Sequence, residues 1–195
     1  MGTKRESGRR RPIVVGVALA VAAAVVAAGL LLFEPWKLWT DETVSEALPT
    51  GAPAAPAAPG TSGGSGTSGA PSAAAAQPPQ TVARGTFISH EHETKGTAKV
   101  VRLADGSHTL RLEGLDTSNG PDLRVWLTDA PVKPGTEGWK VFDDGKHISL
   151  GKLKGNKGDQ NYEIPAGLDL ATYTSVTIWC DRFSVSFGAA ELAKA

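Results

Sequence analysis

The chain has 195 residues, and its 20 Lys and Arg balance its 20 Asp and Glu, so the formal net charge is zero. This balance argues against a nucleic-acid-binding protein, because phosphate recognition needs a positive field. The single cysteine excludes an intrachain disulfide, a Cys₂His₂ zinc site and a Cys-x-x-Cys redox pair.

The N-terminal 33 residues have the pattern of a membrane anchor. Residues 1–12 carry five basic residues and one acidic residue, and residues 13–33 carry no charge. Those 21 residues form a helix of about 31 Å, which matches a hydrocarbon core of about 30 Å. Residues 34–46 then hold four acidic residues and one basic residue. The positive-inside rule therefore predicts a single-pass plasma-membrane protein with residues 1–12 in the cytoplasm and the C-terminal domain outside.

A cleaved signal peptide is the competing interpretation of the same segment. Its apolar region would span about 7–15 residues and end in a small-x-small cleavage site. The run here is longer and ends in Leu-Leu-Leu-Phe-Glu-Pro-Trp at residues 30–36, although an Ala-rich cut near Ala28 remains the alternative. Both interpretations target the chain to a membrane.

Residues 34–83 are predicted to be a juxtamembrane segment followed by a disordered linker. Residues 47–83 contain no charged side chain and are dominated by Ala, Gly, Pro, Ser and Thr. Such a segment cannot bury enough apolar surface to offset the entropy of ordering it. We expect a spacer with an end-to-end distance of about 35 Å as a random coil.

Residues 84–195 are predicted to be one all-β domain. Residues 97–103 and 107–113 flank Asp105-Gly106, the signal of a type I′ hairpin. This turn pairs Val101 with Leu110, so that Val101, Leu103, His108, Leu110 and Leu112 share one face. Further strands are expected over 123–128, 147–150, 160–164, 175–180 and 183–187, with one helical turn over 169–173. Short strands at this spacing indicate an antiparallel β-sandwich.

The domain closely resembles the DM13 family over about residues 84–193. The matching pieces occur in order through the domain: Gly-Thr-Phe at 85–87, His-Glu-Thr-Lys-Gly-Thr-Ala at 92–98, Asn-Gly-Pro-Asp-Leu-Arg-Val-Trp-Leu at 119–127, Leu-Gly-Lys-Leu-Lys-Gly-Asn at 150–156, Gly-Asp-Gln-Asn-Tyr at 158–162, and Ser-Val-Thr-Ile-Trp-Cys at 175–180, followed by Phe183-Ser184-Val185. The resemblance implies an extracytoplasmic β-sandwich that takes part in electron transfer at the cell surface. The resemblance does not extend to residues before 84.

Cys180 is the leading candidate for a functional residue. The family's signature cysteine corresponds to Cys180, for which the resemblance implies a redox thiol or the ligand of a prosthetic group such as haem. His92 lies in the family's His-x-x-x-Gly-Thr piece and is the candidate second ligand. The residues alone leave burial open as well, because Cys180 shares a face with Val176 and Ile178.

Four other positions or groups carry weaker expectations. Trp126 and Trp179 alternate with core residues and would form an outer ligand surface or pack unevenly in the sandwich. Asp122 follows Gly-Pro and is expected to accept backbone N–H bonds in the turn. His90 and His92 would share a face if extended, a weak metal pattern. Residues 160–162 fit either ligand recognition or a turn followed by a buried tyrosine.

The leading functional hypothesis is an electron-transfer component rather than a free-standing enzyme. It needs a redox partner outside the membrane, and it contacts the bilayer through residues 13–33. The alternative hypothesis is a cell-envelope binding or structural module. The sequence has no Gly-x-Ser-x-Gly elbow and no phosphate loop, so hydrolase and nucleotide-binding functions are not expected.

Overall fold

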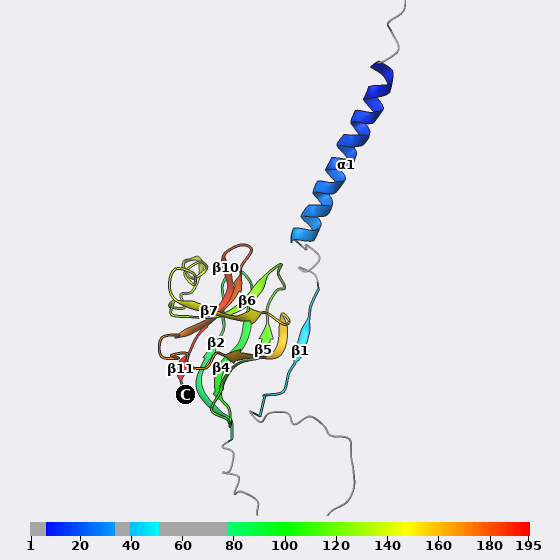
Figure 1. Cartoon of the computed structure of the whole chain (residues 1–195). Coiled ribbons are helices and arrows are strands. Elements are labelled where there is room, and N and C mark those ends of the chain that lie inside the picture. The colour runs from blue at the N-terminus through cyan, green and yellow to red at the C-terminus, as the bar shows by residue number, and fades with distance from the viewer. Residues whose placement is uncertain (1–6, 34–39, 51–77) are drawn as a thin grey trace, which may run out of the picture.

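A computed structural model describes residues 7–33, 40–50 and 78–195 (Figure 1). The rest of the expected cytoplasmic tail and linker, residues 1–6, 34–39 and 51–77, lies outside the described residues. The N-terminal helix α1 (Ser7–Phe33) confirms the expected helix. Within it, the 20 residues Ile13–Leu32 are long and apolar enough to cross a membrane, and their side chains are not buried against protein.

The C-terminal domain is a sandwich of two sheets, as expected. The six-stranded sheet has the order β1-β8-β5-β4-β2-β11, and the five-stranded sheet has the order β3-β10-β9-β6-β7. The strands are β1 (Thr43–Ser45), β2 (Gln80–Thr86), β3 (Ile88–Ser89), β4 (Lys95–Arg102), β5 (His108–Asp116), β6 (Leu123–Thr128), β7 (His147–Lys152), β8 (Lys157–Ile164), β9 (Ser175–Cys180), β10 (Val185–Glu191) and β11 (Ala193–Lys194). All described pairings are antiparallel except that of β1 with β8.

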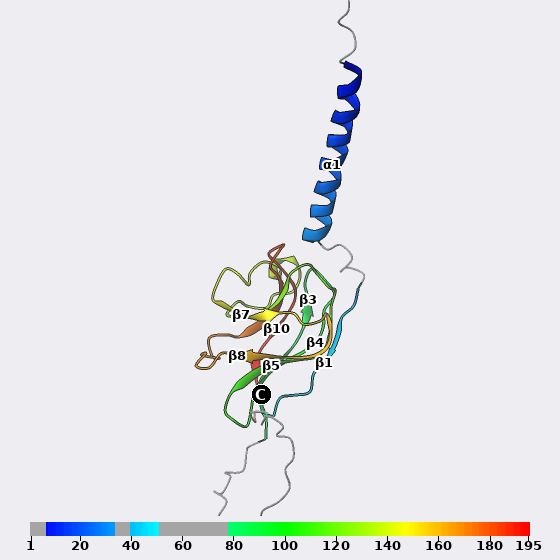
Figure 2. The same cartoon turned by 45° about the vertical axis from the view of Figure 1, so that its right-hand side comes forward.

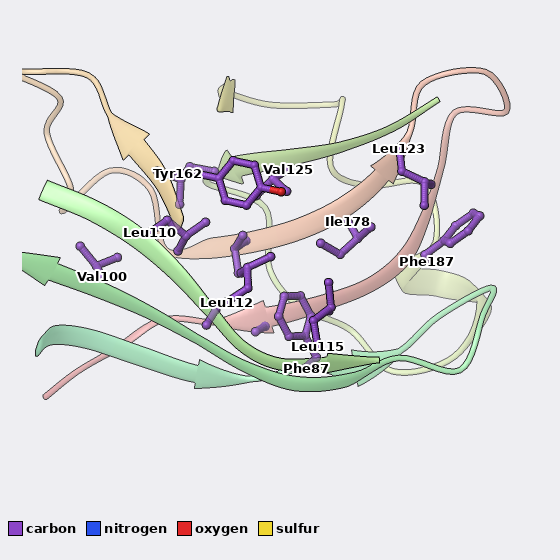
Figure 3. Close-up of a cluster of buried hydrophobic side chains, with 14 of the residues drawn as sticks. Phe87, Val100, Leu110, Leu112, Leu115, Leu123, Val125, Tyr162, Ile178 and Phe187 are labelled. Atoms are coloured by element: carbon purple, nitrogen blue, oxygen red, sulfur yellow. The ribbon is translucent and has the colours of Figure 1, made fainter. Parts of the chain in front are cut away.

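The main core lies between the two sheets. Figure 3 shows Leu110 and Leu112 of β5 directed toward the same space as Val125 and Ile178 of the opposite sheet. All four side chains are completely buried. Alternate residues of a strand point to opposite faces, so each strand contributes every second residue to this layer. Burial of these aliphatic side chains, at about 1.5–3 kcal/mol each, is the main stabilising contribution to the domain.

The β4–β5 hairpin forms where expected, but its register differs by one residue. Leu110 pairs with Val100, and Arg102 with His108, instead of the predicted pairing of Leu110 with Val101. The loop is longer than a two-residue turn: the Leu103 N–H donates to the Ser107 carbonyl, and Gly106 adopts φ +83°. A three-residue loop with glycine in the left-handed region shifts one strand by one position and exchanges its faces. Val100 therefore takes the inward position that was assigned to Val101.

Two segments assigned to the linker belong to the sandwich. Residues 80–83 form the first half of β2, which pairs with β4. Residues 43–45 form β1, the outer strand beside β8 (Figures 1 and 2). Both segments are short and only half-buried, so their own hydrophobic pattern is weak. Their pairing depends on sheet edges that are formed by residues far away in the sequence.

Candidate functional site

Cys180 is the last residue of β9 and lies inside the main core. It pairs with Leu123 of β6 on one side and with Val185 of β10 on the other. Its exposed fraction is 0%, and it shares its face with Val176 and Ile178, as the alternation predicted. The thiol is thus presented to the core and not to solvent.

Two opposing effects act on the Cys180 thiol. Burial raises its pKa above the ordinary value of 9.0, and the nearby Glu91 adds to this rise. Hydrogen bonding by the backbone of Phe183, Arg182 and Asp122 lowers the pKa and opposes the rise, because it stabilises the anion. Burial is the larger effect, so Cys180 is a protonated thiol at neutral pH and a poor nucleophile in the closed fold.

An exposed turn follows Cys180 at once. The chain passes from the buried thiol into residues 181–184, all of which are exposed, and Phe183 is 53% exposed. Ser184 has φ 49°, the left-handed region that a residue other than glycine seldom adopts. A strained, solvent-exposed turn thus closes the end of β9 at which the thiol lies.

His92 lies on the surface near this end of the core. Its ring packs on Phe187 with centroids 4.0 Å apart, and Phe187 belongs to the same core cluster as Cys180. The carboxylate of Glu91 lies 3.9 Å from Nε2 of His92. His90, two residues earlier, is buried and binds other groups, so the two histidines do not form a shared metal pattern. The described residues contain no cluster of three or more His, Cys, Asp or Glu suited to a metal ion.

A haem group held by Cys180 and His92 does not fit this arrangement. An axial thiolate must be deprotonated and must face an open pocket as wide as the porphyrin. Cys180 instead is fully buried among aliphatic side chains, with its pKa raised. The cavity near His108, described below, is not lined by Cys180.

Trp126 and Trp179 form the centre of a second, aromatic core on the outer face of the five-stranded sheet. Their exposed fractions are 6% and 1%, so the expectation of an open ligand surface is not met. The segment between β6 and β7, which includes Ala130 and Phe142, packs over them. It contains the short 3₁₀ helix Thr136–Gly138. Both indoles do lie opposite the main core, as the alternation predicted.

A continuous column of rings runs through this layer. His147 stacks on Trp126 with centroids 4.2 Å apart, and Trp126 stacks on Trp179 at 5.0 Å. Phe142 meets Trp179 edge-on at 6.5 Å, and His90 lies 5.7 Å from Phe142. The column therefore connects the exposed His147, at the start of the outermost strand of this sheet, to the buried His90.

His90 is fixed by a buried polar chain. Its Nε2 lies 3.0 Å from the carbonyl oxygen of Lys133, which only accepts, so Nε2 carries the proton. Its Nδ1 then accepts from Oγ of Ser186 at 2.7 Å, and that hydroxyl lies 2.8 Å from Oγ1 of Thr177. Burial lowers the pKa of His90, which keeps the ring neutral. The sequence signal for this network is a threonine in β9 and a serine in β10, two polar residues within strands that are otherwise largely apolar.

Asp122 does not act as predicted. The carboxylate lies 3.3 Å from Nη2 of Arg124, whose Nε lies 3.1 Å from Oδ2 of Asp181. The backbone carbonyl of Asp122 accepts the N–H of Asp181 at 2.9 Å. In the same turn, Oδ1 of Asn119 accepts the N–H of Gly120. Asp122 therefore helps to join the ends of β6 and β9 beside Cys180.

Gln160 and Tyr162 brace the chain internally. The hydroxyl of Tyr162 donates to Oε1 of Gln160 at 2.7 Å, and Nε2 of Gln160 donates to the Gly155 carbonyl at 2.6 Å. Both side chains are buried, so the interpretation as a turn followed by a buried tyrosine is correct. Asn161 points the other way, toward residues 46 and 47.

A cavity of about 570 Å³ opens at the other end of the sandwich. Its walls are largely aliphatic, and the polar groups around it include His108 and Tyr173; the lining residues from the core side are Val82, Val100, Leu170 and Leu192. Thr174 lies on the rim, directly before β9. Cys180 is at the far end of β9, about 20 Å from Thr174 at about 3.3 Å per residue.

Comparison with known proteins identifies the domain. The family model described as electron transfer DM13 matches residues 86–192, which is more than half of the chain. No curated protein and no solved structure matches the chain. The matched residues run from the end of β2 to the residue after β10 and include the Cys180 end of the core and the aromatic column. The chain therefore belongs to the electron transfer DM13 family.

Proposed function

We propose that this chain is a membrane-anchored, extracytoplasmic electron-transfer module in which Cys180 is the redox-active residue. The family description supports electron transfer, and the apolar helix α1 supports anchoring. The basic residues before the helix support a cytoplasmic position of residues 1–12. The observation that carries the assignment of Cys180 is its setting: a fully buried sulfur at the end of β9 is followed at once by a strained, exposed turn.

The setting of Cys180 restricts its chemistry. A buried thiol with a raised pKa does not exchange disulfides while residues 181–184 are closed. When the turn opens, the sulfur meets solvent. A one-electron acceptor then takes an electron from the thiol as the thiol proton leaves. A donor restores the electron, and the proton returns from solvent.

The Trp126–Trp179 stack is a second candidate carrier within the same function. Indole is among the most readily oxidised side chains, and stacked rings share the charge of a radical cation. The column has one exposed end at His147, where an electron acceptor in solution would make contact. This route needs no opening of the fold, whereas the Cys180 route does.

Electron exchange with the full chain in detergent micelles tests both routes. Ferricyanide serves as the one-electron acceptor, and the radical formed is identified by electron paramagnetic resonance. If Cys180 is the carrier, Cys180→Ala lowers the ferricyanide reduced per chain at least tenfold and removes a sulfur-centred radical. If the stack is the carrier, Trp179→Phe has that effect and Cys180→Ala does not. Trp139→Phe is the control, because Trp139 lies outside the stack.

Equal electron exchange by all four proteins would contradict the electron-transfer proposal. Haemin titration adds a separate test of the prosthetic-group version. Because Cys180 has no open pocket, we expect the same visible spectrum for wild type and Cys180→Ala, without a shifted Soret band.

The alternative function is a cell-envelope binding module, and the cavity near His108 is the observation that favours it. Its aliphatic walls with a few polar groups suit a small apolar ligand with one hydrogen-bonding end. The full chain, held with its C-terminal domain exposed to solvent, should bind a fluorescent apolar probe. Leu170→Trp fills the cavity and should abolish this binding. Retention of the probe by that variant would contradict this function.

A further inference from the structure

Residues 40–50, here called the strap, dock on the domain although they precede the long linker. The strap includes β1, whose residues Thr43, Val44 and Ser45 pair in parallel with Lys157, Gly158 and Asp159 of β8. The carbonyl of Glu42 accepts the N–H of Lys157 at 3.2 Å, and the N–H of Glu46 donates to the carbonyl of Asp159 at 2.9 Å. The matched family region begins only at residue 86, so the strap lies outside it.

Carboxylates on both sides of β1 hold the strap. Glu46 accepts from Nζ of Lys154 at 2.7 Å and from the backbone N–H of Asn161 at 2.7 Å. Asp41 accepts from Nδ2 of Asn156 at 2.8 Å, and its other oxygen lies 2.8 Å from Nζ of Lys157. Lys154 holds the pKa of Glu46 below its ordinary value of 4.5, so this carboxylate is ionised at neutral pH.

The β8 edge is shaped to receive this strand. A Cβ atom at Gly158 would collide with the carbonyl oxygen of Val44, and one at Gly155 would collide with that of Glu42. Nη1 of Arg111, which reaches across from β5, donates to the Glu46 carbonyl at 3.0 Å. Val44, Glu46 and Leu48 are half-buried while the residues between them are exposed, so one face of the strap is directed at the domain.

We propose that the β8 edge is a recognition site for an extended strand with a carboxylate near each end, and that the chain's own strap occupies it reversibly. This goes beyond electron transfer, because strap docking determines how far the domain can lie from helix α1. Together with the proposed membrane anchor, the docked and released strap allow two different maximum distances between α1 and the domain. When the strap is docked, residues 34–39 span at most about 25 Å between α1 and the sheet. When it is released, residues 34–79 span about 40 Å as a coil and far more when extended.

The docked strap therefore keeps the domain beside the bilayer, and residues 51–77 connect β1 to β2 without adding reach. The strap can exchange because its ion pairs lie at the surface, where each contributes little. The backbone pairing with β8 and the side-chain contacts keep the docked state the more populated one. Release also exposes the N–H and C=O groups along β8, which are then available to pair with another strand.

Co-capture of cleaved fragments tests strap docking without relying on the membrane. A specific protease site is placed between residues 51 and 77 of the full chain in detergent micelles, and the chain carries an N-terminal tag. After cleavage, capture of the N-terminal fragment should retain at least half of the C-terminal fragment, because the strap still binds β8. An excess of a synthetic peptide with the sequence of residues 40–50 should displace it.

Two neighbouring proline variants provide a matched comparison. Glu46→Pro removes both the carboxylate and the N–H that donates to Asp159, and we expect co-capture to fall at least tenfold. Ser45→Pro is the control, because strand alternation directs the N–H of residue 45 away from β8, where proline is tolerated. Both changes lie outside the family region, so they leave its core residues untouched. Glu137→Lys, an exposed charge change in the 3₁₀ helix, should also leave co-capture unchanged.

Three results would overturn the proposal. The first is immediate separation of the fragments while the C-terminal fragment keeps its native tryptophan signal. The second is co-capture that survives both Glu46→Pro and the competing peptide. The third is co-capture of two differently tagged, uncleaved chains, which would mean that straps are exchanged between copies. Hydrogen exchange in the uncleaved chain gives an independent readout: Glu46→Pro should deprotect the Lys157 amide, which donates to Glu42, and unchanged protection would count against docking.

Discussion

The indole of Trp126 lies against the indole of Trp179, with ring centroids 5.0 Å apart and planes 25° from parallel. The side chains come from adjacent strands and are diagonal neighbours, because Trp126 pairs with Thr177 and Trp179 pairs with Arg124. The stack gives the five-stranded sheet a second buried face. This sheet is therefore covered on both sides, by the main core and by the segment between β6 and β7.

The Trp126–Trp179 stack should contribute to the stability of the domain and to its near-ultraviolet circular dichroism spectrum. Trp179→Ala removes a fully buried ring, so we expect the free energy of unfolding to fall by about 3–5 kcal/mol. Trp179→Phe and Trp126→Phe keep most of the packing but should each remove the coupled tryptophan band in the near-ultraviolet circular dichroism. Trp139→Phe should leave that band in place. A band that persists in both stack variants would contradict coupling of the two indoles.

The neutral state of His90 predicts a pH dependence of stability. Burial lowers the pKa of His90 in the folded domain below its ordinary value of 6.5. The unfolded chain therefore binds a proton first as the pH falls, so this contribution to stability is complete above pH 6.5 and decreases below it. Chemical unfolding between pH 7.5 and 5 should show this decrease in wild type and a flatter profile in His90→Gln.

Gln is chosen at position 90 because its amide both donates and accepts, as the neutral imidazole does. His92→Gln is the matched control, since His92 is partly exposed and packs on Phe187 instead of entering the polar network. An equal slope in wild type and His90→Gln would show that another group carries the pH dependence.

Ser184 is a strained position at which glycine should stabilise the fold. Its φ of 49° costs an L-residue about 1–2 kcal/mol, which glycine avoids, although glycine loses more chain entropy on folding. We expect Ser184→Gly to raise the free energy of unfolding by about 0.5–1 kcal/mol. If strain in residues 181–184 promotes opening above Cys180, the same variant should slow alkylation of the thiol by iodoacetamide. Faster alkylation would contradict this role of the turn.

Gly188 is required by a close approach between β10 and Thr94. A Cβ atom at position 188 would lie 2.5 Å from Cβ of Thr94. Thr94 is buried, and its hydroxyl lies 3.0 Å from the Phe187 carbonyl and 2.8 Å from Oγ1 of Thr117. Gly188→Ala should therefore lower the free energy of unfolding by about 1–3 kcal/mol, as overpacking of a core does.

Gly106→Ala offers a contrast in the hairpin loop. A Cβ atom there meets open space, so only the φ of +83° opposes it, and we expect a cost of about 1 kcal/mol. Thermal or chemical unfolding of the two variants checks both values. A smaller cost at Gly188 than at Gly106 would contradict the steric argument.

Strand positions and their faces could be predicted from local alternation. The expected ranges 123–128 and 175–180 coincide with β6 and β9, and Val176, Ile178 and Cys180 do share the core face opposite Trp179. Alternation reports which residues are on the same side of a strand because side chains of a strand point up and down in turn. The apolar helix over residues 13–33 could be predicted as well, from composition and length alone.

The sequence could not show what covers each face, because covering segments come from elsewhere in the chain. Trp126 and Trp179 were expected on an outer surface, yet residues between β6 and β7 bury them. The hairpin register depended on one extra loop residue, which placed Val100, and not Val101, in the main core between the sheets. His90 lies far in sequence from Lys133 and Ser186, so their hydrogen bonds have no local signature.

The sequence by itself determined the apolar helix, the β-rich domain, its family and the position of Cys180 on a core-facing strand, since composition, alternation and ordered motifs are local properties. Only the tertiary structure decided that the thiol is closed off, that two tryptophans stack in a second core, and that residues 40–50 pair with β8. These depend on burial and on contacts between distant residues. The strap shows the difference most clearly, because a segment of only three residues forms a strand through its pairing with β8, where Gly155 and Gly158 leave room for it and Lys154 and Lys157 bind its carboxylates.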